Sequence, residues 1–334
     1  MAAVVDTHAH FLPLELVELC RAGGHPRFRV EDGRDGPWLV SASGTRFPVG
    51  PAFHDPEAIL AGMDAAGVAV SVLSVAAPMF FYELEPDAAL AASQVLNDGA
   101  AELARHSSGR LRAMASVPLN APPAAAVELR RAHGLGLRGV EIGASVGLVQ
   151  LDAAELDPFY AAADELGMTV FVHPYTSMVG VGIPPGLDRY FMSNTVGGPF
   201  ETCRAAVRMM LGGVFDRHPG LVVHLAHAGG SLPYQLARVD HTYGLREAVR
   251  ETARRRPLDY LGNLLFDTVA YDARQLDFLA SVAGVERIVF GTDLPFDMVD
   301  LTGIAWAAGL DPGDAERVLE ANAARAYGLE PVSA

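Results

Sequence analysis

Short apolar runs rich in valine, leucine and isoleucine recur along the chain, and each precedes a loop and then a stretch with helical spacing. A strand that is buried on both faces reads as such a run, and alternation of strand and helix predicts a parallel sheet. The runs are Ala3–Val5, Val68–Val75, Leu111–Val117, Gly139–Ile142, Thr169–Val172, Leu221–Leu225, Leu264–Phe266 and Arg287–Phe290.

The intervening segments have the apolar period of helices, and several begin at proline, which the first turn of a helix tolerates. They are Pro56–Ala66, Pro86–His106, Pro122–Leu135, Leu156–Leu166, Phe200–Phe215, Pro233–Arg255 and Asp272–Val282.

Eight strand–helix units predict an α/β protein with the (β/α)8 architecture of a TIM barrel, as a single domain over residues 1–334. A doubly wound open sheet would also show strands and helices in alternation along the sequence. Such a sheet carries a glycine-rich turn after its first strand, whereas the first run here ends in Asp6-Thr7-His8-Ala9-His10. The barrel is therefore favoured.

Two segments depart from the alternation. Residues 23–51 are rich in Gly, Pro, Arg and Asp, and short alternating runs at Phe28–Val30, Trp38–Val40 and Arg46–Val49 predict a small β insertion near the barrel mouth. Residues Tyr175–Pro199 form a connection longer than most, after the fifth strand, and are a candidate active-site loop. A surface loop without a role is the alternative.

Composition narrows the range of functions. Half of the 334 residues are hydrophobic, which is enough for a large core, and a formal charge of −15 argues against nucleic acid as a partner. The chain contains no lysine. Schiff-base chemistry, a phosphate-loop lysine and a carboxylated lysine that bridges two metal ions are therefore excluded.

The sequence favours a cytoplasmic protein without a membrane span. Cys20 and Cys203 lie far apart and match no metal or redox spacing, so we expect two reduced thiols. Residues Met1–Phe11 lack the features of a signal peptide, and the most apolar stretch, Ala65–Tyr82, is interrupted by serine and proline. That stretch is better explained as a buried strand with its exit loop.

Histidine and aspartate side chains stand where four predicted strands end, and strand ends at one face of a barrel form its active site. His8 and His10 are two residues apart, and His173, His227 and Asp293 follow the fifth, sixth and eighth strands. Each alone has an ordinary structural explanation, such as a hydrogen-bonded histidine or an aspartate helix cap. Together they favour a site for one divalent metal ion, with zinc as first candidate and manganese as second.

The motifs around these residues resemble the amidohydrolase superfamily, in particular its decarboxylase branch of aminocarboxymuconate semialdehyde and hydroxybenzoate decarboxylases. The motifs are Asp6–Pro13, Phe171–Pro174, His227–Gly230 and Gly291–Phe296, and the likeness covers nearly the whole chain. The resemblance implies that His8, His10, His173 and Asp293 bind the metal. It also implies that His227 is the acid–base residue beside it. Glu141 could in principle bridge a second ion, but without lysine a single-metal site is favoured.

The resemblance further implies substrate contacts and a homodimer or larger homo-oligomer. Arg246 matches an arginine that reaches into the neighbouring subunit to hold a substrate carboxylate, although a solvated helix arginine is the alternative. Gly50 stands where the semialdehyde decarboxylases carry their other carboxylate-binding arginine, and Asn194 lies in Ser193-Asn194-Thr195, where they have tryptophan. We therefore expect the same reaction on a different acid, with Asn194 and Phe296 as substrate contacts.

The leading functional hypothesis is a metal-dependent, non-oxidative decarboxylase, a carbon–carbon lyase, acting on an unsaturated or aromatic carboxylic acid. In it His227 and Asp293 move protons and Arg246 orients the anion. The alternative is a hydrolase or hydratase of a lactone or carboxymuconate-like acid on the same scaffold, because a metal-activated water serves that outcome too. A catalytically silent barrel used for ligand binding is a third and weaker interpretation.

Overall fold

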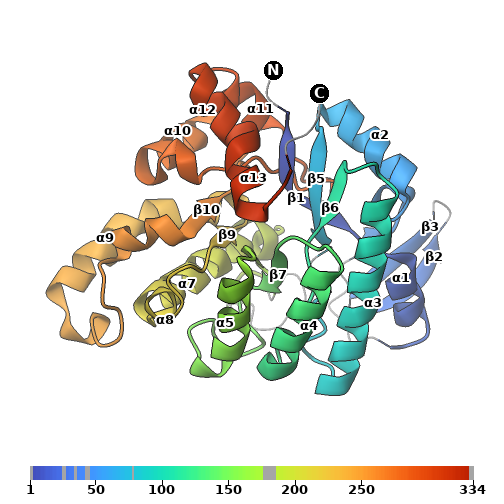
Figure 1. The fold of residues 1–334 in the computed structure, drawn as a ribbon, viewed down its shortest axis with the longest axis horizontal. Helices are drawn as coiled ribbons and strands as arrows, with labels where there is room; N and C mark the ends of the chain where they lie inside the picture. The colour runs from blue at the N-terminus through green and yellow to red at the C-terminus, as the bar shows by residue number, and fades with distance from the viewer. Residues whose placement is uncertain are drawn as a thin grey trace.

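The computed structural model describes residues 3–24, 28–33, 36–41, 46–76, 79–175 and 186–330. Within these ranges, parallel strands form the centre of the molecule and helices surround them (Figure 1). The central strands are β1 (Val5–Phe11), β5 (Val70–Val75), β6 (Leu111–Ala113), β7 (Val140–Gly143), β8 (Val170–His173), β9 (Val223–Leu225) and β10 (Leu264–Phe266).

These strands form two parallel sheets, ordered β1-β5-β6 and β10-β9-β8-β7. A bridge between Ala115 and Val140 connects the two sheets on one side. On the other side the segment 288–294 pairs with β10 through Ile288 and with β1 through Leu294. The ring is thereby closed, which confirms the predicted barrel.

Three strand predictions need correction. The third predicted strand is too long, since β6 ends at Ala113, four residues before the predicted Val117. The first strand extends beyond the predicted Val5 to Phe11, because its pairing with β5 continues from Val5 opposite Val70 to Phe11 opposite Val75. His8 and His10 therefore lie within β1 and not after it. The predicted eighth strand begins too early, since Val285–Arg287 is a 3-10 helix (η7) and the extended segment starts at Ile288.

Helices cover the outside of the barrel, and the predicted helix Pro56–Ala66 is confirmed residue for residue. The longer helices are α1 (Leu14–Arg21), α2 (Pro56–Ala66), α3 (Pro86–Arg105), α4 (Pro122–Gly134), α5 (Asp157–Leu166), α7 (Gly198–Leu211), α9 (Leu232–Leu245) and α10 (Ala273–Ala283). The shorter helices are α8 (Val214–Arg217), α11 (Thr302–Ala307), α12 (Pro312–Glu316) and α13 (Asn322–Tyr327), with several 3-10 and π turns between them.

Two predicted helices are shorter in the structure, for local reasons. The segment Phe200–Phe215 is divided between α7 and α8, because Gly213 adopts the left-handed backbone conformation with φ of 71°. The helix predicted over Pro233–Arg255 ends at Leu245, because the backbone of Arg246 is extended. Arg246 thus stands at the end of α9 and not on its face.

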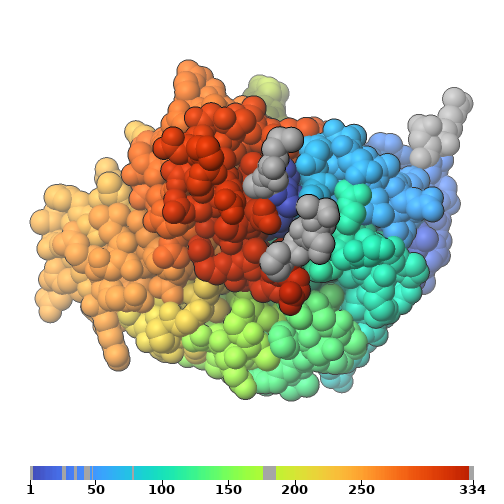
Figure 2. Space-filling model, turned by 45° about the horizontal axis from the view of Figure 1, so that its top comes forward, coloured from blue at the N-terminus to red at the C-terminus, as the bar shows by residue number. Residues whose placement is uncertain are grey.

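Side chains close the end of the barrel at which the strands begin. Val5, Val70 and Phe171 pack there in one buried cluster with Ala323 and Tyr327 of α13. Figure 2 shows residues of the C-terminal helices, in red, over the middle of this face, beside the blue residues of α2. The opposite end, where the strands finish, is left for the functional site.

The predicted β insertion is an antiparallel sheet that follows α1. It consists of β2 (Phe28–Gly33), β3 (Gly36–Ser41) and β4 (Arg46–Pro48), with β3 in the middle. Figure 1 shows it to one side of the barrel, next to α1. In the predicted active-site loop, residues 176–185 lie outside the described residues, and Ser193–Gly197 form a π turn before α7.

Both cysteines are free and buried. Within the described ranges, no helix combines the length and apolar character needed to cross a membrane.

Candidate metal centre and active-site cavity

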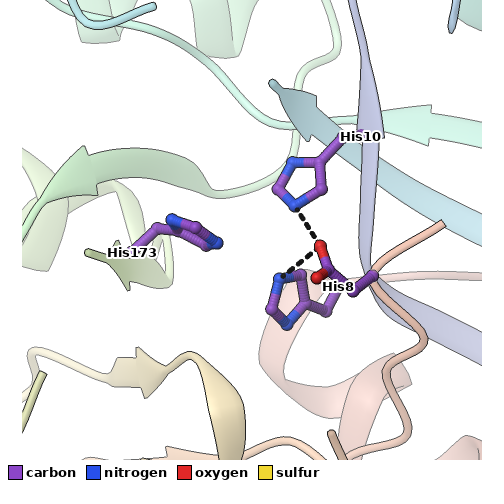
Figure 3. A group of neighbouring side chains, drawn as sticks. His8, His10 and His173 are labelled. Carbon is purple, nitrogen blue, oxygen red and sulfur yellow. Dashed lines mark ion pairs between the residues drawn. The ribbon is translucent and has the colours of Figure 1, made fainter. Parts of the chain in front are cut away.

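Four of the predicted residues meet at the end of the barrel where the strands finish. His8 and His10 project from the same side of β1, His173 is the last residue of β8, and Asp293 lies in the segment 288–294. All four are buried, and one ligand atom from each lies within 4.8 Å of the others. Figure 3 shows the three imidazole rings turned toward one another.

The donor set fits a divalent cation. Within the described part of the chain, the Nε2 atoms of His8, His10 and His173 are buried and make no hydrogen bond of normal geometry. Asp293 Oδ1 lies 3.1 Å from His10 Nε2 and 3.6 Å from His8 Nε2, the two pairs dashed in Figure 3. Buried polar atoms are rarely left without partners, so these convergent lone pairs indicate a ligand that is a cation.

Hydrogen bonds on the far side of each ring orient these lone pairs. His8 Nδ1 lies 2.6 Å from Asp267 Oδ2, and His173 Nδ1 lies 2.8 Å from the carbonyl oxygen of Pro174. His10 Nδ1 is 3.2 Å from Ser74 Oγ and 3.3 Å from the Val75 carbonyl oxygen. A ring that donates from Nδ1 to an acceptor keeps Nε2 unprotonated and available to a metal.

The electrostatics favour the protonation states that metal binding requires. Burial lowers the pKa of His8 and of His173 well below the usual histidine value, so both rings are neutral. Burial acts to raise the pKa of the Asp293 carboxyl, but the close contact with His10 and the nearby His8 and His227 outweigh it, so the pKa is lowered. Neutral imidazoles with one carboxylate suit zinc or manganese.

Asp267 organises the site and was not among the predicted residues. It is fully buried after β10, and its Oδ2 accepts hydrogen bonds from His8 Nδ1 and from the backbone N–H of His227. Its Oδ1 accepts from the backbone N–H of Ala228 and Val269. Asp267 therefore connects a metal-site histidine to the turn that carries His227. The sequence did contain a signal that could have identified Asp267 as a site residue, because Asp267 follows a predicted strand as Asp293 does.

His227 stands beside the four-residue cluster and reaches the cavity. It begins a short 3-10 turn, and its backbone is left-handed with φ of 56°, a conformation that the hydrogen bonds to Asp267 help to hold. Its Nε2 lies 4.0 Å from Asp293 Oδ2, and its side chain is 20% exposed. A partly exposed imidazole at this position can exchange a proton with a molecule in the cavity.

A cavity of about 370 Å³ opens beside His173, His227 and Asp293. This is within the usual size range for small-molecule sites. Asn194 and Phe296 line it, and the Phe296 ring lies 5.3 Å from the His10 ring. The described lining residues of this cavity do not include Arg246 or Gly50 of the same chain. They do include side chains that sequence reasoning missed, among them Arg46, Phe191 and Tyr271.

Glu141 lies on β7, and it is fully buried. Burial raises the pKa of its carboxyl well above the usual value, so this group is protonated and is a poor metal ligand. Among the described residues, the cluster that could hold a cation consists of His8, His10, His173 and Asp293 without Glu141. These observations favour the single-ion site.

The amidohydrolase family model matches residues 5–329. The chain belongs to the amidohydrolase family. It is 33% identical to the 2-amino-3-carboxymuconate-6-semialdehyde decarboxylase of Dictyostelium discoideum, over 83% of this chain and 77% of that protein.

Two solved structures are also similar. A 2,6-dihydroxybenzoate decarboxylase bound to 2,6-dihydroxybenzoate is 26% identical with a TM-score of 0.74, over 98% of this chain and all of that one. The 5-carboxyvanillate decarboxylase of Novosphingobium aromaticivorans, in complex with manganese, is 22% identical with a TM-score of 0.83, over 98% of this chain and 96% of that one.

These relatives place the chain in the decarboxylase branch of the family. It is a metal-dependent, non-oxidative decarboxylase, and thus a carbon–carbon lyase. The hydrolase or hydratase alternative is not favoured.

Proposed function

We propose that the four-residue cluster, His227 and the cavity together replace the carboxyl group of an unsaturated or aromatic acid with hydrogen. The bond between the carboxyl carbon and its neighbour breaks, CO2 leaves, and the electron pair stays on the neighbouring carbon, which takes up a proton. The observation that carries this proposal is the convergence of a cation site and an acid–base histidine on one cavity.

We further propose that His8, His10, His173 and Asp293 bind the ion, with zinc as first candidate and manganese as second. When bound, such an ion stabilises negative charge on oxygen as a Lewis acid. The manganese in the 5-carboxyvanillate decarboxylase supports testing both metals.

His227 and Asp293 are proposed to move the proton. The 4.0 Å separation of His227 Nε2 and Asp293 Oδ2 places both at the cavity wall, close enough for a substrate carbon to lie beside them. His227 is the better proton donor, because a carboxylate that binds a cation holds a proton weakly. Phe296 is proposed to pack on the flat face of the substrate, and the Asn194 amide to contact its polar substituents.

Arg246 is proposed to act in the cavity of a second copy of the chain, in a homodimer or larger assembly. It lies at the exposed end of α9, next to Leu245, whose side chain is 63% exposed. Tyr234 on the same helix is 78% exposed, and large exposed apolar side chains of this kind are typical of interfaces.

We also propose that residues 1–334 form one domain, with residues 23–51 as its insertion. The protein is further proposed to be cytoplasmic, in keeping with two free thiols.

Subunit sharing is tested by mixing two inactive variants, Arg246→Ala and Asp293→Ala. A mixed dimer contains one cavity with both wild-type residues if Arg246 acts across the interface, so activity should return to a fraction of the wild-type value. Mixed dimers without recovery would contradict the proposal.

The reaction itself is tested by product analysis. Metal-loaded protein is incubated with a panel of hydroxybenzoates and muconate-type acids, and CO2 and the remaining acid are measured together. We expect CO2 release with one equivalent of decarboxylated product. Hydrated or ring-opened products that retain the carboxyl carbon would reject decarboxylation.

A further inference from the structure

A line of buried polar side chains connects the C-terminal helix α13 with the metal cluster. Tyr327 is the last residue of α13, and its hydroxyl oxygen lies 2.7 Å from Nδ1 of His224 on β9. Nε2 of His224 lies 3.8 Å from Asp267 Oδ2, the oxygen that accepts from His8 Nδ1. Tyr327 is 2% exposed, and His224 and Asp267 are fully buried. Neither Tyr327 nor His224 has a role in the proposed reaction.

Packing holds both rings of this line in place. The His224 ring lies 4.5 Å from the Phe171 ring, at an angle of 32° between the two planes. The Tyr327 ring lies against Gly139, where a Cβ atom would come within 2.7 Å of the tyrosine Cε1. The contact between Tyr327 and His224 is therefore set by rigid surroundings.

The direction of the hydrogen bonds follows from which groups can donate. Burial raises the pKa of the Tyr327 phenol well above its usual value, so the hydroxyl keeps its proton. Burial lowers the pKa of His224 to about 3, so the ring is neutral and carries one proton. With that proton on Nδ1, the lone pair of Nε2 would face the Asp267 carboxylate and repel it. The proton therefore belongs on Nε2, and Tyr327 donates to Nδ1.

The Nε2–H group of His224 points its positive end at a charge that has few other partners. Among the described residues, the ion pairs of Asp267 are with histidines and not with arginine. A buried carboxylate is stabilised by the N–H groups that surround it. The 3.8 Å separation from Asp267 Oδ2 is too long for a hydrogen bond, but it is short enough for attraction between a charge and a dipole.

We propose that Tyr327 and His224 are positioning residues of the metal centre. Tyr327 fixes the tautomer of His224, and the Nε2–H of His224 then holds the Asp267 carboxylate in place. Asp267 in turn accepts from His8 Nδ1 and leaves Nε2 of that ring for the metal. The inference rests on the proposed ligand set, because its effect on the metal passes through His8. The C-terminal helix thereby supports a site at the opposite end of the barrel.

The chain offers a matched control for Tyr327 in Tyr160. This tyrosine is also fully buried, and its hydroxyl donates over the same 2.7 Å, but to the carbonyl oxygen of Leu151. Y327F and Y160F each remove one buried hydroxyl, so both should lower the melting temperature by a similar amount. Only Y327F should change the metal site.

Competition with a chelator measures the effect on the metal site in the full-length protein. The zinc dissociation constant should rise about 3- to 10-fold in Y327F, less than the roughly 10- to 100-fold typical of a direct partner of a metal-binding histidine. It should stay unchanged in Y160F. H224Q retains an N–H group near the position of Nε2, so it should lose less zinc affinity than H224L, which retains none.

NMR of protein that contains isotope-labelled histidine shows which ring nitrogens carry protons. The signals of His224 are assigned by their absence from H224Q, and those of His8 by their absence from H8Q. We expect wild-type His224 to be protonated at Nε2. In zinc-free Y327F, His8 should carry its proton on Nε2 in a larger fraction of molecules than in wild type, because a less firmly held Asp267 stabilises Nδ1–H less. A loss of stability alone would produce neither result.

A wild-type His224 that carries its proton on Nδ1 would overturn the inference. Equal zinc losses in Y327F and Y160F, or in H224Q and H224L, would do the same. Wild-type zinc affinity in Y327F would also reject the inference, while leaving the proposed ligands and reaction intact.

Failure of the proposed function gives different results. A wild-type protein that takes up no zinc would reject the ligand set, and the His8 signals of Y327F would then decide: transfer of the proton to Nε2 supports the role of Tyr327, and an unchanged distribution rejects it. Absence of CO2 release from every acid, with the zinc and NMR results as expected, would support the inference and reject the proposed reaction alone.

Discussion

Asp267→Asn is the most informative change in the site, because it keeps the shape of the side chain and replaces one acceptor oxygen with a donor. In D267N the remaining oxygen can still accept from Ala228 and Val269, as Asp267 Oδ1 does at 2.7 and 3.0 Å. The amide nitrogen would then face His8 Nδ1 and the backbone N–H of His227, which lie 2.6 and 2.9 Å from Oδ2 in the wild type.

Two donors would thus oppose the new amide group. His8 can relieve the conflict by accepting at Nδ1, but its proton then moves to Nε2, the atom that must bind the metal. Loss of such a supporting hydrogen bond typically lowers metal affinity by about 10- to 100-fold, or about 1.4 to 2.7 kcal/mol. The turn at His227 also loses a bond to a charged acceptor, which costs about 1.5 to 3 kcal/mol.

The assay is competition with a chelator, which reports the zinc dissociation constant of D267N and of wild type. Asp272→Asn is the matched control: Asp272 caps α10 by accepting from the Arg274 backbone N–H, and asparagine performs that role equally well. D272N should bind zinc as wild type does. Wild-type zinc affinity in D267N, with the protein folded, would refute the assignment of Asp267 as the residue that sets the His8 tautomer.

Three further predictions concern the acid–base residue, the metal and pH. His227→Asn should lower kcat by about 10²- to 10⁴-fold while zinc remains stoichiometric by elemental analysis, and loss of zinc in that variant would mean that His227 is a ligand. Removal of the ion with a chelator should abolish CO2 release and lower the melting temperature, with zinc or manganese restoring both; activity that persists in protein verified to be metal-free would contradict the centre. Burial lowers the pKa of His224 to about 3, so below pH 6.5 the unfolded chain binds a proton that the folded chain excludes. Stability should therefore fall with decreasing pH between about 6.5 and 3. The substitution His224→Gln should reduce the difference in unfolding free energy between pH 7 and pH 5, measured by urea unfolding, by about 2 kcal/mol; an unchanged difference would show that His224 is charged in the fold.

Local sequence signals were sufficient for the architecture. Strands buried on both faces leave continuous apolar runs, and a proline at a helix start marks the boundary, so α2 was predicted without error. The errors in helices came from single residues whose backbone conformation a pattern does not reveal. Gly213 breaks the helix between α7 and α8 through its left-handed conformation, and the extended Arg246 ends α9 early.

The reactive residues were recognisable in the sequence because a parallel barrel brings all its strand ends to one face. His8, His10, His173 and Asp293 are up to 285 residues apart, and their chemistry could be inferred from strand position alone. Asp267 carried the same signal, but a buried carboxylate that accepts four hydrogen bonds has no motif of its own, because its partners come from three separate segments.

Residue types and their strand positions were therefore enough to predict the barrel and a site for a divalent cation, because these depend on periodicity and on the chemistry of side chains. The class of reaction was inferred from the motifs that resemble the amidohydrolase superfamily. The wall of the cavity depended on packing between distant segments. Arg46 reaches it because an antiparallel sheet between α1 and α2 places β4 beside the cavity. Arg246, which follows α9, is not among the described residues that line the cavity of its own chain. No local sequence pattern predicts which of these side chains line the cavity, because the cavity wall forms only when separate elements fold against one another.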